Sequence, residues 1–176
     1  VGFLATAFAM YQISMFSLGV ASSNFWLPLT VQGAGLGLIF VPLTTVTNDP
    51  IPRERMGNAT SIFNLMRNIG ASVGIAMVET MQVRKAQMHI NILDKHVNPA
   101  NPMARQTING LQGLFMAQGK DAATANRDAY AAVWAMVQQQ AAMLAYNDTF
   151  RFLALTFVLM LPLVFLMRKP KKGKAV

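Results

Sequence analysis

Long apolar runs separated by short polar breaks organise this chain. The first run covers residues 1–48 without a charged side chain, and Ala-Ser-Ser-Asn at residues 21–24 interrupts it. A helix needs about 20 mostly apolar residues to cross a bilayer, and this run is too long for one element of a soluble core. Residues 1–48 therefore predict two transmembrane helices joined by a tight turn.

A charged turn and a third apolar run follow. Residues 49–55 contain two prolines, which end one helix and preset the first turn of the next. The run at residues 56–82 predicts a third transmembrane helix, in which Arg67 is the only formal charge over residues 56–78.

Glycine pairs in the second and third spans predict close helix packing. Gly33 and Gly37 lie four residues apart in one span, and Gly70 and Gly74 do so in the next. No hydrophobic effect drives helices together in a bilayer, so small residues that let two backbones approach favour association. We expect both pairs to face neighbouring helices.

The pattern becomes amphipathic over residues 83–147, which predicts a helical insertion that projects from the membrane or lies on its surface. Its first apolar stripe is Val83, Ala86, Ile90, Leu93 and Val97, opposite Arg84, Lys85, Gln87, Asp94 and Lys95. Its second is Tyr130, Val133, Trp134, Val137, Ala141 and Leu144, opposite Arg127, Asp128, Gln138 and Gln139. The asparagines and prolines of residues 98–102 predict a loop between them. Glycines make residues 103–119 too broken for a crossing.

A fourth transmembrane helix is predicted at residues 148–168, followed by a basic tail at residues 169–176. Its apolar part is short, so we expect it to recruit Thr149 and Phe150 while Arg151 extends toward the interface. The fold class expected is therefore all-α integral membrane, with four transmembrane helices and a helical insertion.

Composition supports a membrane protein. The chain is 53% hydrophobic and 12% charged, whereas soluble domains carry roughly 25% charged residues. A net charge of +8 suits nucleic-acid binding in principle, but five of the fifteen basic residues fall in the last nine positions. A basic tail after a span is more simply a topology signal or a contact with anionic lipid, so no nucleic-acid partner is expected.

The basic segments also predict an orientation. With four spans, the turn at residues 49–55 and the basic tail lie on one side, and short basic segments mark the cytoplasm. The insertion is then outside the cell or in the periplasm, although Arg84 and Lys85 near a span end weigh against this. The chain begins inside an apolar run without an initiating Met or a signal peptide, so we expect it to be a piece of a longer protein.

Nothing in the sequence predicts an enzyme, a cofactor or a metal site. There is no Ser/His/Asp or Cys/His arrangement and no phosphate-binding loop, and the GAGLG of the second span lacks the preceding strand of a dinucleotide site. His89 and His96 are seven residues apart, but their surroundings offer no further ligands for a metal. With no cysteine, disulfides and thiolate sites are excluded.

Three segments resemble the C-terminal spans of the EmrB/QacA type of drug:proton antiporters, fourteen-span members of the major facilitator superfamily. They are FWLPLTVQGAGLGLIFVPLTTVT, PRERMGNATSIFNLMRNIGASVGIAMVET and AYNDTFRFLALTFVLMLPLVFLMRKP. The most specific part is NLMRNIGASVG at residues 64–74, which is similar to the glycine motif of the family's penultimate span.

The resemblance implies an inner-membrane exporter that moves amphipathic or cationic compounds outward in exchange for protons. Its partners would be membrane lipid, the rest of the transporter chain and, as in Gram-negative relatives, a periplasmic adaptor and an outer-membrane channel. The family's coupling acids lie in earlier spans, so this chain is not expected to transport alone. Two alternatives remain open: a membrane-anchored docking module for the adaptor, and a porter for another substrate class.

Candidate functional residues are concentrated in the third span and its two ends. Arg67 lies about 16 Å along that span, near mid-bilayer, where a charge is costly and marks either a functional or a structural contact. We interpret one face as a conformational packing seam: Asn64, Arg67, Gly70, Ala71 and Gly74. The candidate gating or proton-linked residues are Arg53, Glu54, Arg55 and Glu79. The simpler interpretation of these four is a solvated turn and an interfacial carboxylate.

Overall fold

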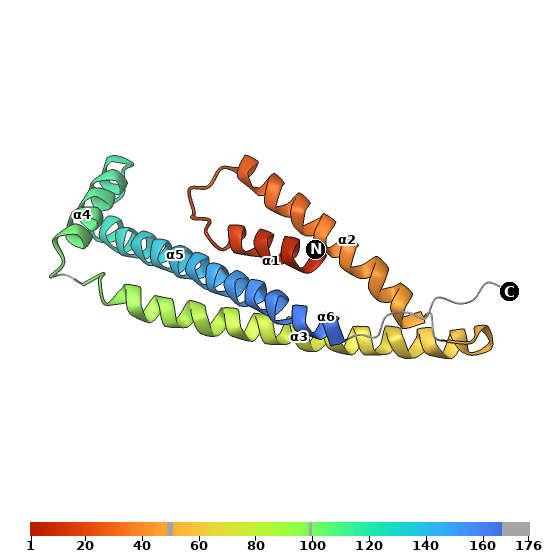
Figure 1. Cartoon of the computed structure of the whole chain (residues 1–176). Coiled ribbons are helices and arrows are strands. Elements are labelled where there is room, and N and C mark those ends of the chain that lie inside the picture. Colours follow the sequence, from red (N-terminus) through yellow and green to blue (C-terminus); the bar gives the residue numbers. More distant parts are fainter. Residues whose placement is uncertain (49–50, 99, 167–176) are drawn as a thin grey trace. The chain divides into compact units, whose positions relative to one another are not determined.

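The computed structural model describes residues 1–48, 51–98 and 100–166 (Figure 1). These residues form helices and no strand, which confirms the all-α class. The elements are α1 (Gly2–Ile13), η1 (Ser22–Phe25), α2 (Trp26–Asn48), η2 (Arg53–Arg55), α3 (Met56–Asp94), α4 (Pro102–Ala117), α5 (Ala122–Leu159) and α6 (Leu161–Leu166). The predicted basic tail at residues 169–176 lies outside the described residues, and so do the side chains of Asn48, Arg53, Phe165 and Leu166.

Three of the described helical segments are long and apolar enough to cross a membrane: Ser22–Thr47, Met56–Asp94 and Ala122–Val164. The first helix, α1, has only 12 residues, or about 18 Å at 1.5 Å per residue, against roughly 30 Å of hydrocarbon. It ends earlier than the predicted span because the chain turns after Ile13, where the Ser14 hydroxyl donates a hydrogen bond to the Tyr11 carbonyl at 2.6 Å.

The chain divides into two compact units. The first holds Val1–Glu79 together with the segment from Thr149 onward, and the second is Thr80–Asp148. The second unit begins and ends within a few residues of the predicted insertion, whose position outside the membrane stays a prediction. The helices α3 and α5 each continue from one unit into the other without a break.

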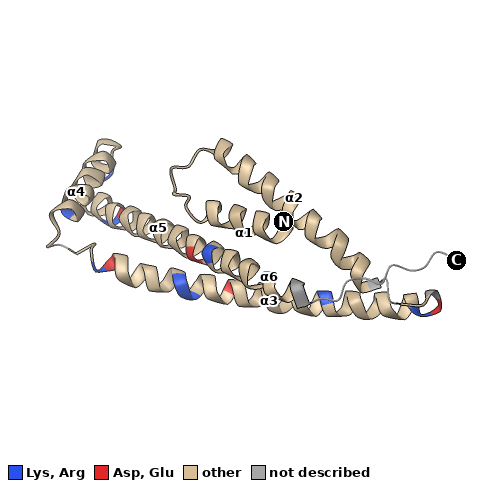
Figure 2. Ribbon diagram, viewed as in Figure 1, with Lys and Arg blue, Asp and Glu red and all other residues tan. Residues whose placement is uncertain are grey.

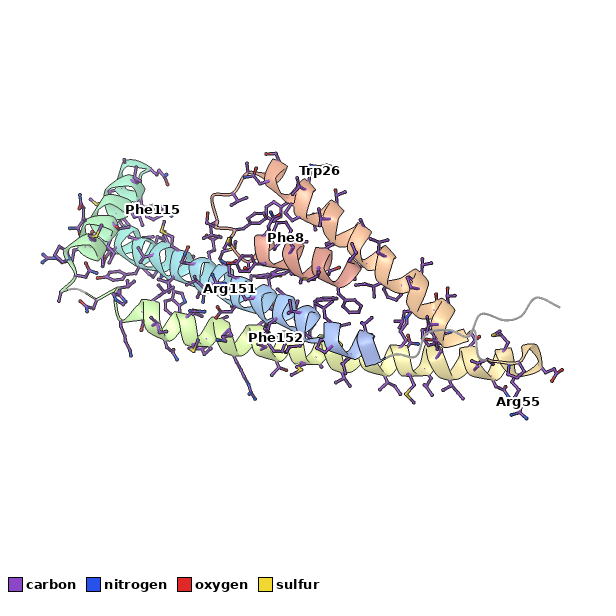
Figure 3. All side chains as sticks on the ribbon, viewed as in Figure 1. Phe8, Trp26, Arg55, Phe115, Arg151 and Phe152 are labelled. Carbon is purple, nitrogen blue, oxygen red and sulfur yellow. The ribbon has the colours of Figure 1, made fainter. Side chains whose placement is uncertain are left out.

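In the first unit α1 packs against α2 (Figure 1). Thr6 is buried between them, and its hydroxyl donates to the Gly2 carbonyl at 3.0 Å. No charge occurs on either helix, as Figure 2 shows. Trp26, labelled in Figure 3, is 76% exposed in the first turn of α2. Outward apolar side chains of this kind suit a helix surrounded by lipid.

The second unit is built on small residues that recur every four positions along α5. The buried positions are Ala125, Ala129, Val133, Val137, Ala141 and Ala145. Ala129 and Val133 meet Ile108 of α4 in a core, with Leu111 and Phe115 of α4 packed against it. Phe115 is labelled in Figure 3. Tyr130 and Trp134 of the predicted stripe are not part of this core and are 50% and 44% exposed. Alanine allows two helices to approach more closely than these large rings do. The face of α5 that carries the buried alanines therefore turns toward the core.

The two connections in this unit follow ordinary capping chemistry. Asn101 caps α4, since its side-chain oxygen accepts from the Met103 backbone N–H at 3.0 Å, and Pro102 fills the first helical position. Between α4 and α5, Gly119 has φ +91°, a conformation that favours glycine. Asp121 begins α5 by accepting from the Ala123 and Thr124 N–H groups at 3.1 Å. Hydrogen bonds from the side chain and backbone of Thr124 hold the pKa of Asp121 below its usual range.

Candidate functional site

The predicted seam lies on the first half of α3 and is open in the described part of the chain. Asn64, Arg67, Gly70, Ala71 and Gly74 are all exposed. A Cβ atom added at Gly70 or Gly74 would meet none of the described atoms within 4 Å. The structure therefore leaves this face available to a further helix, and its role as a seam stays a prediction.

Apolar side chains surround the seam on the same helix. Ile69, Val73, Ile75 and Met77 are 49%, 63%, 60% and 61% exposed. Such exposure over successive turns is not compatible with a helix in water. Lipid or other helices must cover it. Arg67 forms no ion pair with the residues that the structure describes. An arginine in hydrocarbon needs a partner or a route to the interface, so a partner outside the described residues would stabilise it.

Glycine packing is observed at Gly35, between the two predicted positions. A Cβ atom on Gly35 would lie 2.5 Å from Thr6 Oγ1 and 3.1 Å from the Gly2 carbonyl oxygen. A Cβ atom at Gly33 or Gly37 would have no described neighbour within 4 Å, so their packing role remains a prediction. Sequence reasoning favoured the glycine pair and missed Gly35. The small residues Gly2 and Thr6, four apart on α1, were the signal that could have identified it.

The proposed gating residues are not brought together by the described chain. Glu54 and Arg55 are exposed in η2, next to Arg53, whose side chain is not described. Glu79 is exposed on α3, at the end of the first unit. A gating or proton-linked role for these four residues stays a prediction.

A polar cluster that the sequence did not predict lies inside the second unit. Asp148 Oδ2 accepts from His89 Nε2 at 3.1 Å and lies 3.3 Å from Lys85 Nζ. The sequence placed Lys85 away from the apolar stripe, yet its side chain is 36% exposed and contacts Asp148. Val83, a member of that stripe, is 70% exposed. The inward face of α3 passes through Lys85, Ala86, His89 and Ile90.

A shallow groove of about 320 Å³ also lies in the second unit. Its lining is mainly apolar and includes Leu93, Val97, Met103 and Val137. The polar members are His96, Asn101, Thr107 and Gln140. Among the described residues, no group of three or more His, Cys, Asp or Glu side chains is placed to hold a metal ion.

Some known proteins contain a segment that is similar to this chain. No protein-family model and no solved structure matches it. It is 31% identical over 143 residues to the multidrug export protein EmrB of Escherichia coli, a match that covers 81% of this chain and 26% of that protein. The chain is homologous to EmrB-type transporters.

Other relatives align over nearly the whole chain. The fatty acid resistance protein FarB of Neisseria gonorrhoeae is 25% identical over 96% of the chain, and the colistin resistance protein EmrB of Acinetobacter baumannii is 24% identical over 98%. An MFS-type transporter of Bacillus subtilis is 21% identical over 99%. These findings confirm the resemblance to EmrB-type transporters over most of the chain. The chain spans only about a quarter to a third of the length of these relatives.

Proposed function

We propose that this chain is the C-terminal part of an EmrB-type exporter that moves amphipathic or cationic compounds outward across the bacterial inner membrane in exchange for protons. The observation that carries the proposal is the 31% identity to a multidrug export protein over 81% of the chain. The three membrane-length apolar segments support it, since they give the chain the class of fold that a transporter needs. We place the turn at residues 49–55 and the basic tail in the cytoplasm, and the unit Thr80–Asp148 outside.

The proposed role of the chain in transport is conformational. The open α3 face would pack against a helix of the remaining transporter, and Gly70 and Gly74 would allow the two backbones to slide at close range. Arg67 would pair with a carboxylate or carbonyl group on that helix. If Arg67 has one partner in each conformation of the transporter, two discrete conformations are more stable than those between them. Alternating access requires two such conformations.

Export by the whole transporter tests this function. The transporter that contains this chain is expressed in a bacterium lacking its own drug pumps, and the accumulation of a cationic dye is measured with and without a protonophore. We expect several-fold lower dye accumulation, lost on addition of the protonophore. Arg67→Ala should abolish the difference and Arg67→Lys should retain part of it. Unchanged accumulation on expression of the intact transporter would contradict the proposal.

Another substrate class is tested in the same cells. One relative is named for fatty acid resistance and another for colistin resistance. Fatty acids and colistin are therefore candidate substrates beside cationic dyes. Competition of fatty acids, colistin and cationic dyes for dye export separates these classes. A porter for sugars or peptides would leave the accumulation of all three kinds of compound unchanged.

The second unit favours docking of a periplasmic adaptor as a second function. It is a compact unit with its own core at Ile108, Ala129 and Val133, so it can present a fixed surface. Deletion of residues 98–125 removes α4 and its connections. If the unit docks an adaptor, the deletion should abolish resistance in cells but preserve proton-coupled dye transport in membrane vesicles. Loss of both activities would instead show that the unit is part of the transport path.

A further inference from the structure

A pocket lies at the end of the α1 and α2 pair where the chain connects these two helices. Its volume is about 500 Å³, and small-molecule sites in proteins measure roughly 300–1,000 Å³. The lining comes from the last turn of α1, the residues that follow it, η1 and the first turn of α2. All of these residues belong to the first unit, so the pocket is formed within one compact part of the chain.

Backbone hydrogen bonds and a ring contact hold the connection in place. The Phe16 N–H donates to the Ile13 carbonyl at 3.1 Å where α1 ends, and the Asn24 N–H donates to the Ala21 carbonyl at 3.0 Å in η1. The rings of Phe16 and Phe25 then meet edge to face, with their centroids 4.7 Å apart. The chain that leaves α1 is thereby fixed against the chain that enters α2.

Three uncharged polar side chains line the pocket: Gln12, Ser23 and Asn24. None of these side chains has a hydrogen-bond partner among the residues that the structure describes. Two amides and one hydroxyl offer both donors and acceptors to a ligand. Residues 1–48 contain no charged side chain, so the pocket suits a neutral hydrogen-bonding group and cannot neutralise a phosphate or an ammonium group.

The rest of the pocket indicates a position at the edge of the hydrocarbon. The other lining residues are apolar: Met15, Phe16, Leu27 and Pro28. Met15 and Leu27 are 61% and 63% exposed, as expected of side chains that contact lipid. Tyr11 and Trp26, at the same end of the helix pair, are 48% and 76% exposed, and tyrosine and tryptophan are enriched where a membrane meets water. The glycerol ester groups of lipids lie at this depth.

We propose that this pocket binds a membrane lipid through its glycerol ester groups, to whose carbonyl oxygens Gln12, Ser23 and Asn24 donate hydrogen bonds. Lipid tails are as apolar as leucine, so the apolar wall gives little preference for one lipid molecule over another. The three polar side chains therefore determine which lipid is retained. The site depends on the membrane location of the chain and not on export. In the orientation proposed above, its lipid comes from the outer leaflet.

A comparison of ester-linked and ether-linked lipids tests the site. The 176-residue chain is placed in vesicles of equal parts diester and diether phosphatidylethanolamine, extracted in mild detergent, and its bound lipid is measured by native mass spectrometry. The ether lipid has the same head group and tail length but lacks both carbonyl oxygens. The ester lipid should be retained in about fivefold excess or more, since each net hydrogen bond contributes about that factor. Equal retention of the two lipids would overturn the proposal.

Substitutions in the pocket identify the groups responsible. Gln12→Leu and Asn24→Leu remove the amide groups at little change in side-chain size, and each should lower the ester preference about fivefold. Gln32→Leu is the matched control, because it makes the same change on α2 outside the pocket lining, and it should keep the preference. Circular dichroism checks that each variant is helical. An ester preference retained by both pocket variants would overturn the proposal.

The other possible occupants give different results. The measurement is repeated on the transporter that contains this chain, where loss of the ester preference would show that a further helix fills the pocket, against the proposal. Displacement of the lipid by ethidium would assign the pocket to an exported compound, also against the proposal. An ester preference in a transporter that exports no dye would contradict the proposed export and leave the lipid site standing.

Dye export by a transporter without the preference would contradict the lipid site alone.

Discussion

Replacing Gly35 with valine is expected to separate α1 from α2. The first added carbon would lie 2.5 Å from Thr6 Oγ1 and 3.0 Å from the Thr6 backbone nitrogen, and a backbone atom cannot rotate away as a side-chain end can. Overpacking of this kind typically costs 1–3 kcal/mol, and a clash with backbone falls at the upper end. Thermal unfolding of the detergent-solubilised chain, followed by circular dichroism, should show a Tm several degrees lower.

Gly33→Val and Gly37→Val are the matched controls for this substitution. They add the same side chain to the same helix, at positions where an added Cβ meets no described atom within 4 Å. We expect their Tm to stay close to that of the unsubstituted chain. A Gly35→Val chain as stable as these two controls would contradict the packing of α1 on α2.

Replacing Gly74 with leucine is expected to abolish export by the whole transporter. The seam face of α3 would meet a neighbouring helix in the assembled transporter, and leucine would prevent the close approach that glycine allows. In the chain alone an added Cβ at Gly74 meets no described neighbour within 4 Å. The substitution should therefore leave the Tm of this chain unchanged while dye export by the transporter is lost.

A control variant and a measurement of protein amount show whether export is lost through the seam or through loss of the protein. Ile75→Leu conserves the side-chain volume at the neighbouring residue, which is 60% exposed, and it should retain export. The amount of Gly74→Leu transporter in the membrane, measured by an epitope tag, should remain a substantial fraction of normal. Full export by Gly74→Leu would refute the seam on α3.

The sequence predicted the long apolar helices best, because the surrounding solvent largely determines their structure. Hydrocarbon requires long apolar helices with satisfied backbone groups, and the apolar runs predicted α2 and the membrane-length parts of α3 and α5. The end of α1 was not predicted, because the serine and glycine residues after Ile13 are compatible with both a helix and a turn. The sequence predicted separate segments on either side of residues 83 and 148, whereas α3 and α5 continue through these residues without a break.

In the second unit, the sequence pattern predicted which helix positions face inward only to within about one residue. Ala86, Ile90, Leu93 and Val97 lie on the inward side of α3, as their spacing indicates. On α5 hydrophobicity favoured Tyr130 and Trp134, but close packing selected the alanines beside them. A periodic pattern gives the face of a helix, whereas the rotation of that face depends on the shape of its partner.

The candidate site was less predictable than the fold for the same reason. Gly33 and Gly37 match the spacing for close packing, yet Gly35 meets α1, because the partner positions Gly2 and Thr6 determine the contact. Lys85 was placed on a polar face because it is charged. The carboxylate that draws it inward, Asp148, lies 63 residues later in the chain, beyond the reach of any local pattern.

Membrane flotation tests the central claim, that hydrocarbon is the solvent for the long helices. Membranes from cells that produce the chain are washed with alkaline carbonate, placed at the bottom of a density gradient and centrifuged. The chain should float with the lipid, as an integral membrane protein does. Release into the carbonate wash, or recovery as free protein in the detergent-free soluble fraction, would contradict the account.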